Sequence, residues 1–257
     1  MEKLTKSVGL KKICIMRVPR IYCDDKLVSG ASIQLDSETA HYLINVLRLK
    51  LDNEINLFNG DTGEFRGVIT SGSKKEVVVK INEQLSKPSR SPLYLHLALG
   101  LSKGDRMDYA IQKSVELGVA EITPLYTEFN EVRFKDIARL QKKLIHWGKI
   151  AIAACEQCGS HGPPTINIPV ALNEFLKKKS NASRLVLDKS GDNSLSEIAK
   201  SEAIDLVVGP EGGLSTFELK NLQSQGYKVI NMGPRILRTE TAPIAALAIL
   251  QSGYGDM

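Results

Sequence analysis

The chain has 257 residues, of which 42% are hydrophobic and 25% charged, so a packed core is expected and extensive disorder is excluded. Its formal net charge of +5 is compatible with an anionic partner such as nucleic acid but does not require one. The longest apolar run, "APIAALAIL", is shorter than the roughly 20 residues that span a bilayer, and "ICIM" is too short for a signal peptide. We therefore expect a cytoplasmic protein of one or two domains.

The first part of the chain is predicted to form a small β domain. Four runs have strand-like composition, and they read "ASIQL", "EINLF", "EFRGVIT" and "EVVVKI". One helical stretch, at residues 37–47, interrupts them. The run "SKPSRSP" at residues 86–92 carries prolines and serines but no apolar residue, which is typical of a linker.

Beyond this linker, strand-like and helix-like runs alternate. Predicted strands at 93–99, 120–126, 184–188, 204–208 and 227–232 each precede a predicted helix, at 105–118, 140–157, 195–200, 216–226 and 239–250. Alternating β and α units indicate a largely parallel sheet covered by helices. Ligands of such sheets bind at the carboxyl ends of the strands.

Two glycine-containing loops follow predicted strands at such ends. The first, "GPEGGLS" at 209–215, has too many glycines and prolines for a regular element, so the chain must turn sharply there. Ser215 and Glu218 fit a capping box, which predicts that a helix begins directly after this loop. The second loop, "GPRILRTETAP", occupies 233–243.

The composition of these loops favours a nucleoside over a triphosphate. Neither loop contains G-x-G-x-x-G, and the chain has no G-x-x-x-x-G-K-[ST] sequence. The loops carry the carboxylates Glu211 and Glu240 where a triphosphate site would bring a lysine. Close backbone approach suits a flat nucleoside, and a nearby carboxylate would favour a sulfonium cation. S-adenosylmethionine meets both conditions, whereas two tight turns with capped helices remain the structural alternative.

The cysteines do not predict a metal site. Cys155 and Cys158 form a C-x-x-C pair, but Cys14 and Cys23 lie at the other end of the chain, and His161 alone does not supply a second pair of ligands. We expect two small apolar side chains at a helix end, and no bound metal.

The loops also carry a family resemblance. "GPEGGLSTFE" followed by "MGPRILRTETAPIAALA" resembles the signature of the SPOUT-superfamily methyltransferases that modify N3 of a uridine in 16S ribosomal RNA, the RsmE family. "KGDRMDYAIQKSVELGVAEITPLYTE" resembles the central motif of that family, and "HYLINVLRLKLDNEINLFNGDTGEF" resembles its N-terminal PUA-like domain. The resemblance extends over about residues 17 to 255.

This resemblance implies a fold and partners. It implies an N-terminal extension at 1–15, a PUA-like RNA-binding β-barrel at 16–88, and an α/β SPOUT domain with a C-terminal trefoil knot at 89–257. Family members tend to begin near "MRVPRIY", so Met16 is predicted to begin the functional domain. The implied partners are S-adenosylmethionine, the 16S rRNA of the small ribosomal subunit, and a second copy of the chain in a homodimer.

The resemblance also implies site residues. Residues that match the cofactor loops are Gly209, Glu211, Gly212, Gly213, Met232, Gly233, Ile236, Leu237, Arg238, Thr239, Thr241 and Ala242. Arg238 is the candidate to stabilise charge on the uracil carbonyl oxygens. Glu240 is a candidate proton acceptor, although it could instead bond backbone N–H groups and hold its loop. Candidate RNA contacts are Arg20, Arg48, Lys50, Arg66, Lys103, Arg106 and Lys113.

Some of these cations have alternative interpretations. Lys113 and Glu116 could pair along a helix surface, and the N-terminal arginines could be solvated or pack within their own domain. Ser160 and Phe129 stand where the family usually has arginine. Because both changes remove a cation, two alternative functions stay open: a SPOUT methyltransferase acting on another RNA, and a non-catalytic RNA-binding protein of ribosome assembly.

Overall fold

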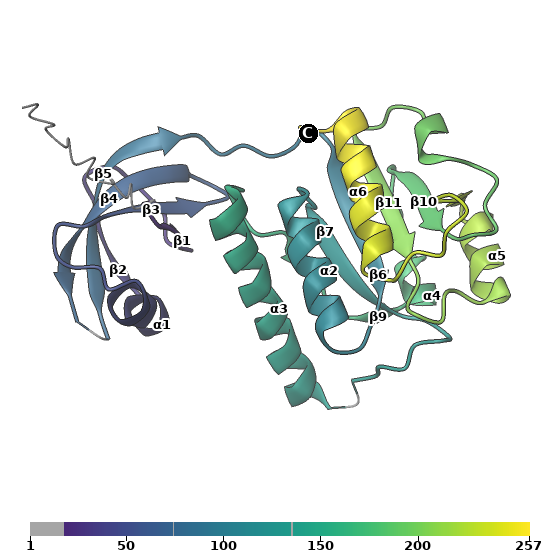
Figure 1. Ribbon diagram of the computed structural model, residues 1–257, viewed down its shortest axis with the longest axis horizontal. Helices are drawn as coiled ribbons and strands as arrows, with labels where there is room; N and C mark the ends of the chain where they lie inside the picture. The colour runs from purple at the N-terminus through teal and green to yellow at the C-terminus, as the bar shows by residue number, and fades with distance from the viewer. Residues whose placement is uncertain (1–17, 74, 135) are drawn as a thin grey trace, which may run out of the picture.

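A computed structural model describes residues 18–73, 75–134 and 136–257 and shows two domains joined by an extended segment (Figure 1). The predicted extension and its boundary at Met16 lie outside the described residues. The elements of the first domain are β1 (Arg20–Tyr22), β2 (Ser32–Leu35), α1 (Ser37–His41), the π-helix η1 (Tyr42–Val46), β3 (Glu54–Asn59), β4 (Gly63–Gly72) and β5 (Val77–Ser86). Residues 87–93 then connect this domain to the second without regular structure.

The first domain is a five-stranded sheet with the strand order β1-β3-β4-β5-β2. Along β4 buried and partly exposed residues alternate, as expected for a strand with one face on a core. Ile55, Leu57, Ile69 and Val79 form part of that core and are fully buried. The four predicted strands are therefore confirmed. The sequence pattern missed β1 because it has only three residues and pairs in parallel with β3.

The predicted helix at 37–47 forms in two parts. Asp36 caps α1 by accepting hydrogen bonds from the backbone N–H groups of Glu38 and Thr39. The chain then widens into η1, which ends where the Leu47 N–H donates to the Tyr42 carbonyl. The helical pattern was thus recognised, but its hydrogen-bond register changes from α to π partway along.

The second domain contains a seven-stranded sheet in which every pairing is parallel. Its elements are β6 (Tyr94–Gly100), α2 (Asp105–Glu116), β7 (Glu121–Tyr126), α3 (Ile137–Cys158), β8 (Thr165–Ile166), β9 (Val170–Ala171), α4 (Leu172–Phe175), β10 (Ser183–Leu187), the 3₁₀ turn η2 (Leu195–Glu197), β11 (Ala203–Val208), α5 (Thr216–Ser224), β12 (Lys228–Ile230) and α6 (Thr241–Tyr254). The strand order is β12-β10-β11-β6-β7-β8, with β9 also pairing with β7. The predicted parallel α/β architecture is confirmed.

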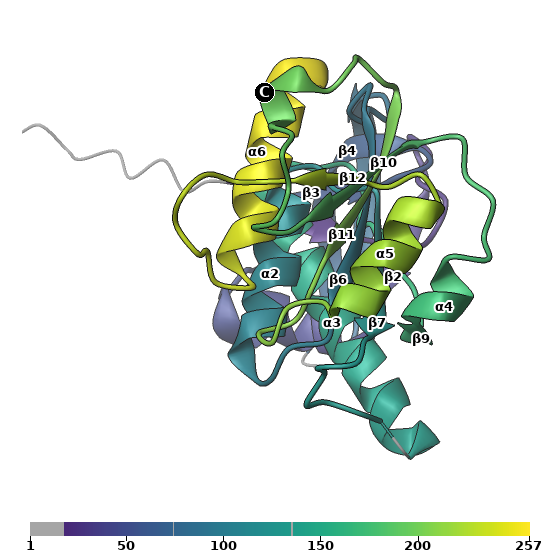
Figure 2. The same ribbon diagram turned by 90° about the vertical axis from the view of Figure 1, so that its right-hand side faces the viewer.

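Helices cover both faces of this sheet (Figure 2). Leu95, Leu97 and Leu99 of β6 pack in one core with α2, α3 and α6. Ala98 of the same strand faces the opposite core, which holds residues of α4 and α5. Because successive side chains of a strand point to opposite faces, the mostly apolar strand β6 supplies both cores.

Residues 195–200 form only a 3₁₀ turn where a helix was predicted. Leu195 and Ile198 are both buried in the core. Residues three apart lie in line in a 3₁₀ helix, so a single turn is enough to bury this pair. In contrast, α5 begins as predicted. Ser215 Oγ accepts from the Glu218 N–H at 3.2 Å, while Glu218 Oε2 accepts from the Ser215 N–H at 2.9 Å.

Arg20 joins the two domains and corrects a prediction. Its Nη1 donates to the Cys155 carbonyl at 2.7 Å, its Nη2 donates to the Ser160 carbonyl at 3.1 Å, and its Nε pairs with Glu64 at 3.0 Å. Its guanidinium carbon lies 4.1 Å from the ring centre of Phe58. Because only 9% of the Arg20 side chain is exposed, this guanidinium is not available to an RNA phosphate. Arg20 stabilises the contact between β1 and the end of α3 instead.

No helix within the described ranges has the length and apolar character needed to cross a bilayer.

Candidate functional site

Three loops meet at one edge of the parallel sheet. β12, β10 and β11 are neighbours, so their carboxyl ends, at residues 230, 187 and 208, lie together. The loops that follow these strands enclose a cavity of about 350 Å³. This volume falls within the range of about 300–1,000 Å³ that small-molecule sites occupy. The sheet order therefore places a ligand-sized cavity at the predicted position.

The 209–213 loop folds back tightly on the sheet. The Gly213 N–H donates to the Pro210 carbonyl at 2.8 Å, and Gly213 has a φ of 72°, a conformation that side chains other than glycine adopt at a cost. A Cβ on Gly100, at the end of β6, would lie 2.4 Å from the Pro210 nitrogen. The backbone of this loop is therefore held close to the strand ends and presents its peptide groups to the cavity.

The loop between β12 and α6 forms the opposite wall. The Gly233 N–H donates to Asn231 Oδ1 at 2.9 Å, and Gly233 has a φ of 93°. The chain then leads to Ile236, which is 86% exposed although apolar. The Thr241 and Ala242 N–H groups both donate to the Arg238 carbonyl at 2.9 Å, and α6 begins there. An exposed isoleucine at the rim of a cavity is available to pack on a flat ligand.

The structure brings most of the predicted cofactor residues together. All of them except Arg238 and Thr241 line the cavity. Sequence reasoning missed the third loop, which follows β10 and contributes Asp188 and Lys189, and it also missed Asn231 and Arg235. The signal for the third loop was present, because the strand at 184–188 was predicted, but its position beside β12 follows only from the sheet order.

Glu211 lines the cavity but is already paired. Its Oε1 accepts from Arg106 Nη1 at 3.0 Å and from the Lys103 N–H at 3.3 Å. Burial acts to raise the pKa of this carboxyl, but backbone N–H groups and the Arg106 guanidinium outweigh it and hold the pKa below its usual value. Glu211 therefore ties the 209–213 loop to the start of α2. Because its charge is already paired with Arg106, Glu211 is less suited to attract a sulfonium than the sequence indicated.

Arg238 and Glu240 lie next to the cavity. The Arg238 side chain is 82% exposed, whereas that of Glu240 is 14% exposed, and Arg238 Nη1 lies 4.0 Å from Glu240 Oε1. Glu240 Oε2 is buried and has no hydrogen-bond partner among the described residues. Glu240 also makes no side-chain capping bond to α6. An unsatisfied buried carboxylate oxygen has the capacity to accept a proton or a hydrogen bond from a ligand.

The remaining predicted RNA contacts differ in their surroundings. Lys103 pairs with Glu131, and more than half of each side chain is exposed. Lys113 Nζ donates to both Glu116 oxygens, at 2.7 and 2.9 Å, which is the helix-surface pairing considered from the sequence. In the first domain Arg48 and Lys50 are exposed and Arg66 is partly exposed, with its Nε 4.0 Å from Glu54 Oε2.

The two departures from the family pattern have separate locations. A Cβ on Gly212 would lie 2.8 Å from the Phe129 Cβ, so Phe129 packs directly against the 209–213 loop. Its side chain is nevertheless 47% exposed. Ser160 lies at the domain junction, where its hydroxyl donates to the Gly162 carbonyl at 3.3 Å. Only Phe129 therefore replaces a cation close to the cavity.

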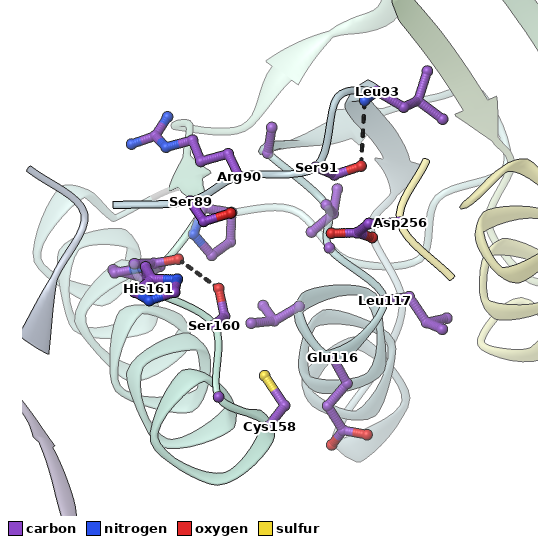
Figure 3. Close-up of a pocket in the computed structure, with 18 of the residues that line it drawn as sticks. Ser89, Arg90, Ser91, Leu93, Glu116, Leu117, Cys158, Ser160, His161 and Asp256 are labelled. Carbon is purple, nitrogen blue, oxygen red and sulfur yellow. Dashed lines mark hydrogen bonds between the residues drawn. The ribbon is translucent and has the colours of Figure 1, made fainter. Parts of the chain in front are cut away.

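A second cavity, of about 380 Å³, lies at this domain junction (Figure 3). It is lined by linker residues such as Arg90 and Ser91, by the ends of α2 and α3, and by the 158–164 segment. Among the described residues, none from the two glycine loops reaches it. We therefore place the functional site in the cavity at the strand ends.

The C-x-x-C pair has the environment of structural cysteines. Cys155 is fully buried, and burial raises the pKa of its thiol to about 12, while Cys158 is exposed. A thiol with so high a pKa is a poor nucleophile and a poor metal ligand at neutral pH. Within the described ranges, no group of three or more His, Cys, Asp or Glu side chains gathers as a metal site would require.

Both domains match known families. Residues 35–82 match the family described as RNA methyltransferase PUA domain, and residues 89–251 match the family described as RNA methyltransferase domain. Ribosomal RNA small subunit methyltransferase E of Buchnera aphidicola subsp. Schizaphis graminum is 37% identical over 243 residues, covering 94% of this chain and 98% of that protein. The protein of the same name from Bacillus subtilis is 30% identical, covering 88% of this chain and 91% of its own.

Solved structures agree with these matches. A Legionella pneumophila protein, solved in complex with its cofactor SAM (S-adenosylmethionine), superposes with a TM-score of 0.90 at 39% identity, covering 94% of this chain and all of that one. Ribosomal RNA small subunit methyltransferase E of Neisseria gonorrhoeae, bound to S-adenosyl methionine, gives a TM-score of 0.85 at 34% identity with the same coverage.

Proposed function

Because the chain belongs to the family of RNA methyltransferases that includes ribosomal RNA small subunit methyltransferase E, we propose that it transfers the methyl group of S-adenosylmethionine to N3 of a uridine in 16S ribosomal RNA. The observation that carries this proposal is the cavity enclosed by the loops at the ends of β10, β11 and β12. Two solved relatives bind the same cofactor.

The residues around the cavity fit S-adenosylmethionine. A Cβ on Gly213 or Gly233 would meet no atom within 4 Å, so both glycines face open space with positive φ. Leu187, Val208 and Leu237 supply apolar surface for adenine, and the backbone groups of both glycine loops supply hydrogen bonds. S-adenosylmethionine, when bound, supplies an electrophilic methyl group on a sulfonium.

The residues beside the cavity fit the needs of a uracil acceptor. Uracil N3 must lose its proton, and negative charge develops on the neighbouring carbonyl oxygens. The exposed guanidinium of Arg238 can donate hydrogen bonds to such an oxygen, which would stabilise that charge. Glu240 Oε2, buried and unpartnered, is suited to accept the N3 proton directly or through a water molecule. These roles make Arg238 a catalytic residue and Glu240 the candidate base.

We also infer a trefoil knot and a homodimer from the family resemblance. The segment after β10 packs against β12, because the Asn231 N–H donates to the Asn193 carbonyl at 2.9 Å and Asn193 Nδ2 donates to the Val229 carbonyl at 3.2 Å. The segment after β10 therefore lies beside β12, in the region where the family resemblance predicts the knot, a topology that is rare in proteins. The PUA family match of the first domain supports RNA binding there, with the exposed Arg48 and Lys50 as phosphate contacts.

A methyl-transfer assay tests the proposed function. Small subunits, naked 16S rRNA and transfer RNA, all purified from a strain that lacks this gene, are each incubated with the protein and radiolabelled S-adenosylmethionine. We expect label at N3 of one uridine in the small-subunit RNA. Label in transfer RNA or at another position would show a different target, and cofactor binding without transfer would show a non-catalytic RNA-binding protein.

A further inference from the structure

Helices α4 and α5 lie on the same face of the sheet of the second domain (Figure 2). A basic groove lies between α5 and α4 with the turn after it. It encloses about 830 Å³, and Asn221 Nδ2 of α5 bridges to Asn173 Oδ1 of α4 at 2.9 Å. We call this hollow the α4–α5 groove. Five cations line it, and they are Lys177, Lys178, Lys179, Arg184 and Lys220. Three of these lysines are consecutive in the sequence, and such a run by itself indicates only a solvated helix end.

The charge of this groove is compensated only in part, by carboxylates that lie outside it. Among the described residues that line it there is no carboxylate. Lys177 pairs with Glu174 at 2.7 Å, but both side chains are mostly exposed, so this pair is weak. Arg184 donates to the Gln225 and Ser180 carbonyls, which fixes its position, and its charge is partly compensated by Asp205, whose pKa it helps to lower. Several cationic side chains around one groove create a positive potential that attracts polyanions.

An exposed aromatic ring lies within the same groove. Phe217, in the first turn of α5, is 70% exposed and lines the groove beside Lys220. Leaving a phenylalanine in water has a hydrophobic cost that neighbouring polar residues do not reduce. Aromatic rings interleaved with cations are the arrangement by which proteins bind single-stranded nucleic acid, since every base has a face that can stack.

We propose that the α4–α5 groove is a second RNA-binding surface, which holds a single-stranded segment of the substrate RNA by phosphate contacts and by stacking on Phe217. α5 begins at Thr216, directly after the loop that lines the cofactor cavity, so the end of the groove at Phe217 lies next to that loop. Helix α5 lies on the side of the second domain away from the first domain (Figure 1). This inference rests on the proposed function, since it names a further contact of the same substrate.

Two charge-matched variants of the full chain test the proposal. Lys179→Gln with Lys220→Gln removes two groove cations, and Lys142→Gln with Lys200→Gln removes two exposed lysines elsewhere. A fluorescent single-stranded fragment of 16S rRNA is titrated with each protein over a range of salt concentrations. For single strands each lost phosphate contact lowers the slope of log K against log salt by about 0.7, so we expect the groove pair to lower it by about 1.4. The control pair should keep the wild-type slope.

A third variant separates stacking from charge. Phe217→Ala should weaken binding of the same fragment at least about tenfold while leaving the salt slope unchanged, because stacking is worth about 1–3 kcal/mol per base. Ultraviolet cross-linking of the wild-type complex should join RNA to the peptide that contains Phe217.

The outcomes distinguish this inference from the proposed function. Wild-type affinity and slope in both the groove pair and Phe217→Ala would overturn the inference, even if methyl transfer to 16S rRNA is found. Loss of affinity confined to the groove variants would support it, even if the methylated position proves different. A slope that falls equally in the groove and control pairs would also overturn it, because the attraction would then reflect net charge alone.

Discussion

Replacing Arg20 with alanine should separate the two domains without removing an RNA contact. The side chain of Arg20 bonds Glu64 within its own domain and carbonyls at the end of α3 in the other, 135 residues away in the sequence. Tyr22 adds a bond to the same helix, since its N–H donates to Glu156 Oε1 at 3.1 Å. Arg20→Ala therefore removes the cation that bonds both Glu64 and the carbonyls of the other domain, and it leaves the neighbouring Tyr22 contact as a weaker connection.

The size of the effect follows from burial. The side chains of Arg20 and Glu64 are 9% and 14% exposed. Removing one partner of a buried ion pair costs about 3–5 kcal/mol, because the other charge stays buried without compensation. Glu64 Oε1 keeps a hydrogen bond from Asn56 Nδ2 at 2.8 Å, so we expect the lower end, about 3 kcal/mol. Glu64→Gln should cost less, and the double variant should cost less than the sum of the two.

Urea unfolding measures this effect in each domain. Trp147, the only tryptophan in the sequence, is buried in the second domain, so its fluorescence reports on that domain alone. Circular dichroism reports on both domains. In wild type the two signals should change together, and in Arg20→Ala the dichroism should show an additional transition at lower urea. RNA affinity, measured below that transition, should keep the wild-type salt slope. Unchanged stability together with a reduced salt slope would refute this reasoning and restore Arg20 as an RNA contact.

Three further predictions concern the cofactor site and the contact between helices α2 and α3. Gly213→Val should reduce S-adenosylmethionine affinity in calorimetry at least about tenfold, because its φ of 72° strains a β-branched residue and its Cβ faces the cavity; an unchanged affinity would show that the loop is only a turn. Arg238→Ala should bind RNA and cofactor but react at least about a hundredfold more slowly in single turnovers, and a wild-type rate at saturation would remove its catalytic role. Asp108→Asn should cost about 1 kcal/mol of unfolding free energy at pH 7, because Asp108 accepts from Lys143 and Trp147. Burial raises the Asp108 pKa, but His146 and Lys143, which bond the carboxylate, outweigh it and lower the pKa. The difference between wild type and variant should therefore be complete above about pH 4 and disappear as the pH falls further; a constant difference in urea titrations down to pH 2 would contradict this assignment.

The sequence by itself determined the features that depend on neighbouring residues. Strand and helix periodicity, the linker composition and the Ser215–Glu218 capping box are local patterns, and they appear in the structure where they were predicted, except that the helix predicted at 195–200 forms only the turn η2. The two glycine loops were recognised because only sharp turns accommodate such a composition after a strand. Short elements such as β1 and α4 escaped prediction, since a few residues carry too little periodicity and their stability comes from partners distant in the chain.

The tertiary structure alone decided which of these residues act together. The order β12-β10-β11 brought the loop at residues 188–191 to the cavity, although β10 lies far from β12 in the sequence. It also decided what each charge does: Arg20 is buried at the domain junction, Arg106 is paired with Glu211, and the lysines after α4 face Phe217 across a groove. The free energy of a charge depends on its solvation and on the charges within a few ångströms, and both are set by contacts between segments far apart in the chain.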